Sequence, residues 1–95
     1  NCTASSEAYR LLTGGHGDAG QALIDSRTAA DGLPYGSTFT FNEFSLEPRP
    51  GGIIDHIFFR NASGVKRWGV ISDIWDGRFA SDHFPVLAEI VLDRR

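Results

Sequence analysis

The stretch SDHFP at residues 81–85 places an acid and an imidazole side by side, immediately before the apolar segment VLAEIVL at residues 86–92. That segment is typical of a buried strand. A second acid, Asp55, lies inside another apolar run, IIDHIFF at residues 53–59. The rest of the chain is interpreted as a scaffold that brings these two strands together.

Length and composition limit the kinds of protein to which this sequence can belong. The 95 residues form at most one small domain, and a hydrophobic content of 41% is normal for a globular protein. The net charge is −3 and no cluster of Lys or Arg is present, so extended nucleic acid is not a favoured partner. A single cysteine excludes an internal disulfide, and no apolar run is long enough to predict a membrane span. The sequence also lacks a Gly-rich phosphate loop, a zinc-binding Cys/His spacing and a nucleophile elbow.

Local patterns predict an α+β fold. Ser6 followed by Glu7 predicts the start of a helix, and the Gly-rich stretch 13–17, with His16 as a solvated loop residue, predicts its end. Residues 19–30 can form a second short helix or a brief strand, and the helix is preferred. Strands are predicted at residues 37–42, 53–60, 66–73 and 86–92. Helices followed by four strands predict a mostly antiparallel sheet with helical cover.

Three strands carry more specific predictions. In residues 37–42, Phe39 and Phe41 are expected to point one way and the threonines the other. The run 53–60 is apolar on both faces apart from Asp55, His56 and Arg60, which is typical of a central strand covered on both sides. In the last strand, alternate residues as far as Leu92 are expected to face the core.

Asp55 is the first candidate site residue. It shares its face of the predicted strand with apolar residues, where an ionised carboxylate is costly unless it is paired. One interpretation is a buried acid that holds a loop backbone, and the other is an acid paired with an imidazole. His83 is the best partner because it follows a loop, where site residues commonly occur. Such a pair fixes the tautomer of the imidazole and keeps it protonated, so that it can contact a phosphoryl oxygen.

Other residues near these motifs have less specific roles. Asp82, on the opposite side from His83, can bind a hard cation directly or through water. His56 faces away from its neighbour Asp55 and is interpreted as a packing residue. The loop 74–84, with Trp75 and Arg78, can contact substrate, although an ordinary surface loop explains it almost as well.

Several of these motifs, in this order, resemble the endonuclease/exonuclease/phosphatase superfamily. SDHFPV at residues 81–86 is similar to its carboxy-terminal signature, IDHIF at 54–58 to its preceding strand motif, and TFTFNEF at 38–44 to its Thr-Phe strand. NCTASSEAY at residues 1–9 resembles the family's Gly-Asp-Phe-Asn motif from the asparagine onward. The resemblance implies that residues 1–95 are the carboxy-terminal portion of a single domain, and that this domain is a four-layered α/β/β/α sandwich.

The resemblance also implies hydrolysis of phosphomonoester or phosphodiester bonds with magnesium or manganese. Asn1 would orient the attacking water or the phosphate, Asp55 would orient His83, His83 would stabilise charge on the phosphoryl group, and Asp82 would serve the metal. The predicted substrate contacts are Phe39, Trp75 and Arg78.

The predicted partners are a small or lipid-linked phosphate ester and the amino-terminal half of the same domain, with the other metal ligands. The chain alone is expected to be inactive and to self-associate through an uncovered sheet face. The alternative function is a non-catalytic half-domain that acts as an interaction or structural module.

Overall fold

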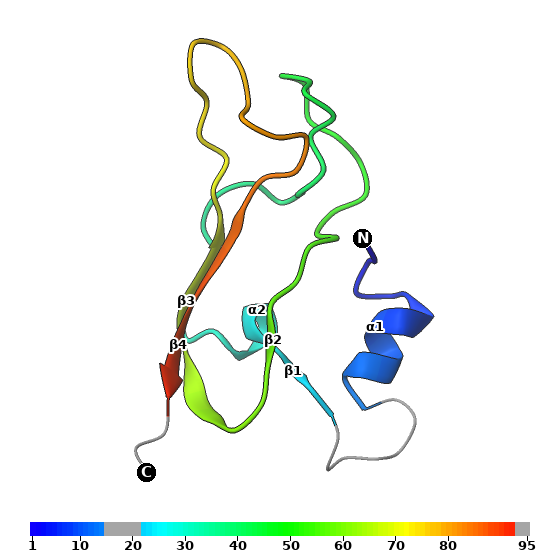
Figure 1. The fold of residues 1–95 in the computed structure, drawn as a ribbon, viewed down its shortest axis with the longest axis vertical. Coiled ribbons are helices and arrows are strands. Elements are labelled where there is room, and N and C mark those ends of the chain that lie inside the picture. The colour runs from blue at the N-terminus through cyan, green and yellow to red at the C-terminus, as the bar shows by residue number, and fades with distance from the viewer. Residues whose placement is uncertain (15–21, 93–95) are drawn as a thin grey trace.

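The computed structural model describes residues 1–14 and 22–92. Its strands form two antiparallel sheets, β1 with β2 and β3 with β4, and together with two short helices they confirm the predicted α+β class (Figure 1). No helix in the described part of the chain is long and apolar enough to span a membrane. The elements, in chain order, are α1 (Glu7–Leu12), β1 (Ile24–Asp25), α2 (Ser26–Ala29), β2 (Phe58–Phe59), β3 (Ala62–Val70) and β4 (Val86–Leu92).

Helix α1 begins where the sequence predicts. The hydroxyl of Ser6 caps the helix by accepting a hydrogen bond from the Tyr9 N–H at 3.1 Å. After the helix, Gly14 takes a left-handed conformation with φ of 100°, as a glycine at a helix end readily does. The rest of the predicted helix end, including His16, lies outside the described residues.

The helix predicted for residues 19–30 is wrong for residues 22–25, which precede α2 and are not helical. Residues 24–25 form β1, only residues 26–29 are helical, and residues 19–21 lie outside the described part. The physical reason is Asp25, which has extended backbone and accepts a hydrogen bond from the Arg27 N–H at 3.0 Å. Its carboxylate therefore starts a new helix in the middle of the segment.

The hydrophobic core lies on one face of the β3–β4 pair. Trp68 and Val70 of β3 are 2% and 1% exposed and pack with Phe84, which is 5% exposed. Val86 and Ala88 of β4 pack against the same cluster. The predicted bounds of the last strand, residues 86–92, are confirmed.

Two strand ends differ from prediction. Strand β3 spans Ala62–Val70 instead of residues 66–73. It begins earlier than predicted because Asn61 makes the preceding turn in a left-handed conformation with φ of 62°. At the far end of β4, Leu92 is 76% exposed and does not face the core as predicted. Its partner in the ladder is Ala62, the first residue of β3, so Leu92 lies at the open end of the sheet.

The strand predicted at residues 37–42 is wrong. Its one ladder-like contact is an isolated antiparallel bridge between Phe41 and His83. Thr40 and Asn42 are fully buried, whereas Phe41 is half-buried, which reverses the expected facing of the threonine. Their polar side chains bond to backbone groups of neighbouring segments, and these bonds take the place of a regular ladder.

The central strand predicted at residues 53–60 is also wrong. Only Phe58–Phe59 form a strand, β2, which pairs with β1, and residues 53–57 lie outside any ladder. The whole run 53–59 is half-buried and not covered on both sides. Residues 53–57, here called the crossing segment, run from the segment 36–52 down to β2 (Figure 1), and Asp55 lies within them.

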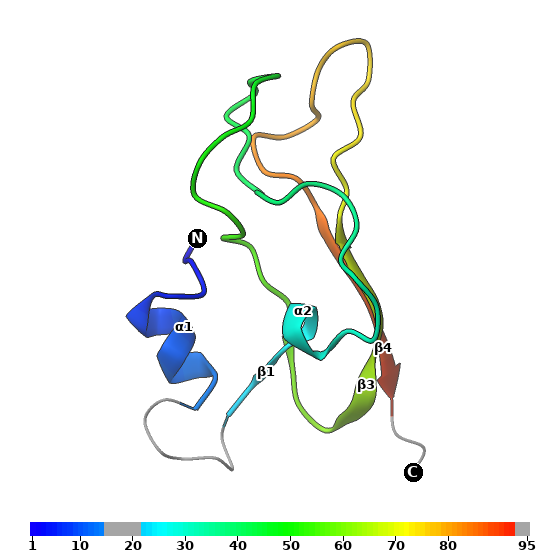
Figure 2. The same cartoon turned by 180° about the vertical axis from the view of Figure 1, so that it is seen from behind.

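Segments that are far apart in the sequence meet at one end of the molecule. The segment 36–52 and the loop 71–85 lie together there, opposite the end where β4 finishes (Figures 1 and 2). Helix α2 packs on β3 and β4. Helix α1 lies beside β1, where the Tyr9 hydroxyl donates a hydrogen bond to the Asp25 carboxylate at 2.5 Å.

Candidate active site

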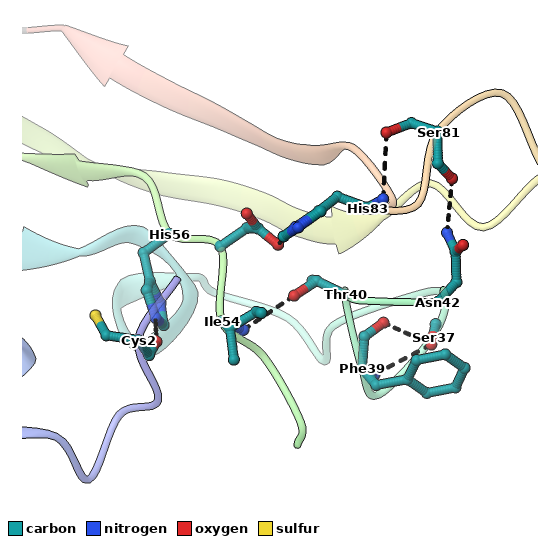
Figure 3. Close-up of polar contacts among 10 residues, drawn as sticks. Cys2, Ser37, Phe39, Thr40, Asn42, Ile54, His56, Ser81 and His83 are labelled. Atoms are coloured by element: carbon teal, nitrogen blue, oxygen red, sulfur yellow. Dashed lines mark hydrogen bonds and ion pairs between the residues drawn. The ribbon is translucent and has the colours of Figure 1, made fainter. Parts of the chain in front are cut away.

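Asp55 and His83 form the predicted acid–imidazole pair. The His83 Nδ1–H donates a hydrogen bond to Oδ2 of Asp55 at 2.8 Å (Figure 3). Asp55 comes from the crossing segment before β2, and His83 comes from the loop that leads into β4. Their side chains are 33% and 30% exposed, so the pair is partly shielded from water.

The surroundings of Asp55 favour its ionised form. Partial burial raises the pKa of this carboxyl, but hydrogen bonds from His83 and Thr40 and the charge of His83 outweigh burial and lower the pKa below its ordinary value. The Thr40 hydroxyl also accepts a hydrogen bond from the Ile54 N–H at 2.9 Å. One buried hydroxyl can therefore fix both the backbone beside Asp55 and the carboxylate itself.

Phe41 and Ser81 hold His83 on its other sides. The ring centroids of Phe41 and His83 are 5.2 Å apart and the rings are tilted by 60°. The backbone N–H of His83 donates a hydrogen bond to the Ser81 hydroxyl at 3.2 Å. The imidazole also lines a small, mostly apolar cavity of about 60 Å³ together with Trp75 and Phe79. A substrate group that reaches His83 would therefore lie against aromatic side chains.

Asn1 precedes a residue that is anchored to the crossing segment, on which Asp55 lies. The Cys2 N–H donates a hydrogen bond to the Ile54 carbonyl at 3.2 Å. The predicted role of Asn1 in orienting water or phosphate stays a prediction.

His56 packs as predicted and also anchors the amino-terminal segment. Its ring packs against those of Tyr9 and Phe58, at centroid distances of 5.2 and 5.6 Å. Its Nε2–H donates a hydrogen bond to the Cys2 carbonyl at 2.6 Å, and its Nδ1 is buried without a hydrogen-bond partner in the described part of the chain. Sequence reasoning missed the bond to Cys2 because it joins positions 54 residues apart.

Asp82 is the predicted metal ligand. It is half-buried, and its carbonyl accepts hydrogen bonds from the N–H groups of Asn42 at 2.7 Å and Glu43 at 3.3 Å. Within residues 1–14 and 22–92, no three Asp, Glu, His or Cys side chains are grouped so that they could hold a metal ion. Mg²⁺ usually takes one or two carboxylates together with water and substrate phosphates. The described residues therefore do not fit a complete magnesium site by themselves.

The three predicted substrate contacts lie in different surroundings. Phe39 packs against the core, with its ring centroid 5.6 Å from that of Phe84. Trp75 is 57% exposed and lines the same cavity as His83. Arg78 faces Trp75 across a tight two-residue turn, in which each residue's N–H donates to the other's carbonyl, at 2.8 and 2.9 Å. The structure thus brings Trp75 to the pair and Phe39 to the core, and their substrate contacts stay predictions.

Two buried polar residues of the site, Thr40 and Asn42, were not predicted from the sequence. Both alternate with phenylalanines in residues 38–42, a pattern that assigns polar side chains to the exposed face of a strand. Asn42 is shown reaching toward Ser81 in Figure 3, across 39 positions of the chain. No local sequence signal distinguishes such a buried, bonded side chain from an exposed one.

Comparison with known proteins finds related solved structures. One is a conserved protein of unknown function from Enterococcus faecalis V583, with 29% identity and a TM-score of 0.78 over 98% of this chain. Another is an endonuclease/exonuclease/phosphatase family protein from Bacteroides thetaiotaomicron, with 31% identity and a TM-score of 0.78 over 96% of this chain. A third, from the same species, is a mannosyl-6-phosphatase, with 32% identity and a TM-score of 0.72 over 93% of this chain.

These alignments cover only part of each related structure. The chain spans 34%, 34% and 33% of their lengths, which is about a third in each case. The sequence matches no protein-family model, and no curated protein is significantly similar to it. The identities and the shared fold nevertheless agree with the motif resemblance of residues 38–44, 54–58 and 81–86. Sequence and fold together therefore support the endonuclease/exonuclease/phosphatase superfamily for this chain.

Proposed function

We propose that this chain contributes the imidazole–carboxylate pair of a phosphoesterase, an enzyme that hydrolyses phosphomonoester or phosphodiester bonds. The observation that carries the proposal is the 2.8 Å hydrogen bond from His83 Nδ1 to Asp55, on a carboxylate whose pKa is lowered. The superfamily likeness and the mannosyl-6-phosphatase neighbour support the same reaction class. We further propose that the chain is the carboxy-terminal portion of a four-layered domain, since it spans about a third of those structures.

The pair acts by preparing a hydrogen-bond donor for the phosphoryl group. Because an ionised carboxylate only accepts hydrogen bonds, Asp55 keeps a proton on Nδ1 of His83. When the imidazole is protonated, Nε2 also carries a proton that it can donate to a phosphoryl oxygen. A donor that is already in place costs no reorganisation when negative charge develops in the transition state.

The other predicted site residues complete this proposal. Asn1 would orient the attacking water or the phosphate, and Asp82 would supply one carboxylate to a magnesium or manganese ion, whose further ligands lie beyond the described residues. Such an ion would stabilise negative charge on the phosphate. Trp75 and Arg78 would contact the group attached to the phosphate.

We propose a small or lipid-linked phosphate ester as the substrate. The net charge of −3 does not favour an extended nucleic acid, and the cavity beside His83 has room for a small group. The mannosyl-6-phosphatase neighbour makes a sugar phosphate the first compound to assay.

A second candidate function is a non-catalytic half-domain that serves as an interaction or structural module. The specific observation in its favour is that no metal-binding group of three side chains occurs in the described residues. The two functions differ in what they require of His83, because an interaction module needs no charged donor at this position.

The test is phosphoesterase turnover by the complete protein that carries this chain, in magnesium and in manganese. p-Nitrophenyl phosphate, bis(p-nitrophenyl) phosphate and mannose 6-phosphate cover both bond types. His83→Ala is expected to lower turnover by ~100-fold or more, as loss of one preorganised donor does. The matched control is Arg67→Ala, which breaks an exposed ion pair with Glu89 on the β3–β4 sheet and should change turnover little. Near-parental turnover of His83→Ala on every substrate that the parent cleaves would refute the assignment.

A further inference from the structure

The Asn42 side chain is a fully buried amide with both of its polar ends bonded. Its Nδ2 donates a hydrogen bond to the Ser81 carbonyl at 2.9 Å, and its Oδ1 accepts one from the Phe44 N–H at 2.7 Å. The orientation of the amide is unambiguous because one partner can only accept and the other can only donate. One bond is local and the other reaches the loop that carries His83 (Figure 3).

Backbone hydrogen bonds extend this contact along the same loop. The Asp82 carbonyl accepts from the N–H groups of Asn42 and Glu43, and the Phe84 N–H donates to the Thr40 carbonyl at 2.7 Å. The residues on both sides of His83 are therefore tied to the segment 40–43. His83 itself forms a bridge with Phe41 between these ties.

The same segment also holds the other member of the pair. The Thr40 hydroxyl accepts a hydrogen bond from the Ile54 N–H, and a hydrogen bond from Thr40 lowers the pKa of Asp55. Asp55 and His83 thus share one anchor, although they come from separate parts of the fold. The side chain that joins this anchor to the His83 loop is that of Asn42.

The local backbone explains why an asparagine occupies this position. Glu43 and Phe44 both have φ of 57°, a left-handed conformation that is unfavourable for residues with a side chain. The bond from the Phe44 N–H to the Asn42 Oδ1 supports this turn, as Asn side chains commonly do two residues ahead. The Nδ2 group of the same amide remains free to donate its hydrogen bond to the Ser81 carbonyl.

We propose that Asn42 is a positioning residue, which aligns the His83 imidazole with Asp55 through its hydrogen bond to the Ser81 carbonyl. This inference rests on the proposed function of the pair, but it concerns a residue with no substrate contact. It predicts that loss of the long-range bond alone, with the local turn kept, disturbs the pair.

Two substitutions separate the long-range bond from the local one. Asn42→Ser keeps a hydroxyl that can accept from the N–H two residues ahead, as Ser37 does for Phe39 and Ser45 does for Glu47 at 3.1 Å each. The serine side chain is too short to reach the Ser81 carbonyl. Asn42→Ala removes both bonds. Ser45→Ala is the matched control, because it removes a side-chain bond from the same loop whose partner, Glu47, lies outside the His83 loop.

The readout is NMR of the protein labelled at His and Asp, without substrate. In Asn42→Ser and Asn42→Ala, we expect the hydrogen-bonded Nδ1 proton of His83 to be lost and the pKa of Asp55 to rise toward its ordinary value. The Trp68 indole signal, which reports the core, should stay in place, and Ser45→Ala should match the parent in all three measurements.

Each other outcome overturns the proposal. If Asn42→Ser keeps the His83 Nδ1 proton and the Asp55 pKa of the parent, only the bond within the local turn matters. Loss of the Trp68 signal together with the pair in both Asn42 variants would mean that Asn42 supports the fold as a whole. Because no readout uses turnover, a failure of the phosphoesterase assay and a failure of this proposal are distinguishable.

Discussion

His83 Nδ1 lies 2.8 Å from the Asp55 carboxylate, although the two residues are 28 positions apart in the sequence. The contact depends on a third segment. The Thr40 hydroxyl accepts a hydrogen bond from the N–H of Ile54, next to Asp55, and Phe41 forms an antiparallel backbone bridge with His83. The acid and the imidazole are therefore held by the fold, and not by their own short motifs. Substitutions in this pair should change its chemistry more than the stability of the core.

The first prediction concerns the charge of Asp55. Asp55→Asn keeps the shape of the side chain and replaces the charged acceptor of the His83 Nδ1–H by a neutral amide, so turnover of the complete protein should fall by about tenfold or more. The control is Glu89→Gln on β4, which removes an exposed carboxylate paired with Arg67 and should leave turnover near the parent value. Equal turnover of parent and Asp55→Asn would show that the charge has no catalytic role.

Asp55→Asn also tests how the free energy of unfolding depends on pH. The pKa of Asp55 is lowered in the folded protein, so its contribution to stability is present above its unfolded pKa of about 4 and is lost as pH falls through the folded pKa. Denaturant unfolding of parent and Asp55→Asn from pH 6 to pH 2.5 should show a difference that shrinks below about pH 4. A difference that is the same at every pH would contradict the lowered pKa.

The sequence predicts those features that local chemistry controls. Ser6 caps α1 because a hydroxyl before a helix can accept its unpaired N–H groups, and this requires no distant partner. The last strand was predicted with correct bounds because all of its residues from Val86 to Leu92 except Glu89 are apolar. The pairing of Asp55 with His83 was predicted because a carboxylate in an apolar run needs a partner.

Features that depend on distant partners were not predictable. Phe39, Thr40 and Phe41 alternate like a strand, yet buried bonds of Thr40 and Asn42 replace the ladder and turn polar side chains inward. The tight turn between Trp75 and Arg78 did have a local signal. Asp76 and Gly77 both have positive φ, 49° and 73°, and the Asp-Gly pair is a common sequence for such a turn.

The second prediction concerns the partly buried hydrogen bond between Tyr9 and Asp25. Burial, followed by the hydrogen bond to Asp25, raises the pKa of Tyr9 from 10.0 to about 12. The contribution of Tyr9 to stability should therefore be complete below pH 10 and decline as pH rises from 10 to 12. At pH 8, Tyr9→Phe should lower the free energy of unfolding by about 1 kcal/mol, which is typical of one hydrogen bond.

Denaturant unfolding of parent and Tyr9→Phe at pH 8 and at pH 11.5 tests this prediction. The difference between the two proteins should be clearly smaller at the higher pH. A difference that stays constant would show that the hydroxyl is ionised over the same range in the folded and unfolded states.

The third prediction concerns Gly36, which lies against the edge of β3. Its φ is 83°, and an added Cβ would lie 1.8 Å from the Val70 carbonyl oxygen. Gly36→Ala should lower the free energy of unfolding by about 2–5 kcal/mol, from the left-handed conformation and from displacement of the strand. Gly32→Ala is the matched control, since a Cβ there meets nothing within 4 Å, and it should change stability by about 0.5 kcal/mol or less. Similar effects of the two alanines would mean that Gly36 and β3 are not in this close contact.

The last prediction concerns a chain of residues 1–95 alone. Its described core has only four buried hydrophobic side chains, and each of its sheets has two strands. Two-stranded sheets need further cover to be stable. Several large apolar side chains are also exposed, among them Leu33, Phe44, Leu46, Trp75 and Leu92. We therefore expect the isolated chain to self-associate, and to show no turnover with magnesium because its described residues lack a three-ligand site.

Analytical ultracentrifugation over a range of concentrations and a phosphoesterase assay in magnesium test both parts of this prediction on the same sample. The expected result is a sedimenting mass that rises with concentration above the 10.4 kDa of the monomer, without turnover. Addition of the rest of the domain as a separate polypeptide should then lower self-association and restore activity, because it would cover the apolar face and supply metal ligands. A stable monomer with magnesium-dependent turnover would instead show that residues 1–95 contain a complete site, and would overturn the proposal that they are one portion of a larger catalytic domain.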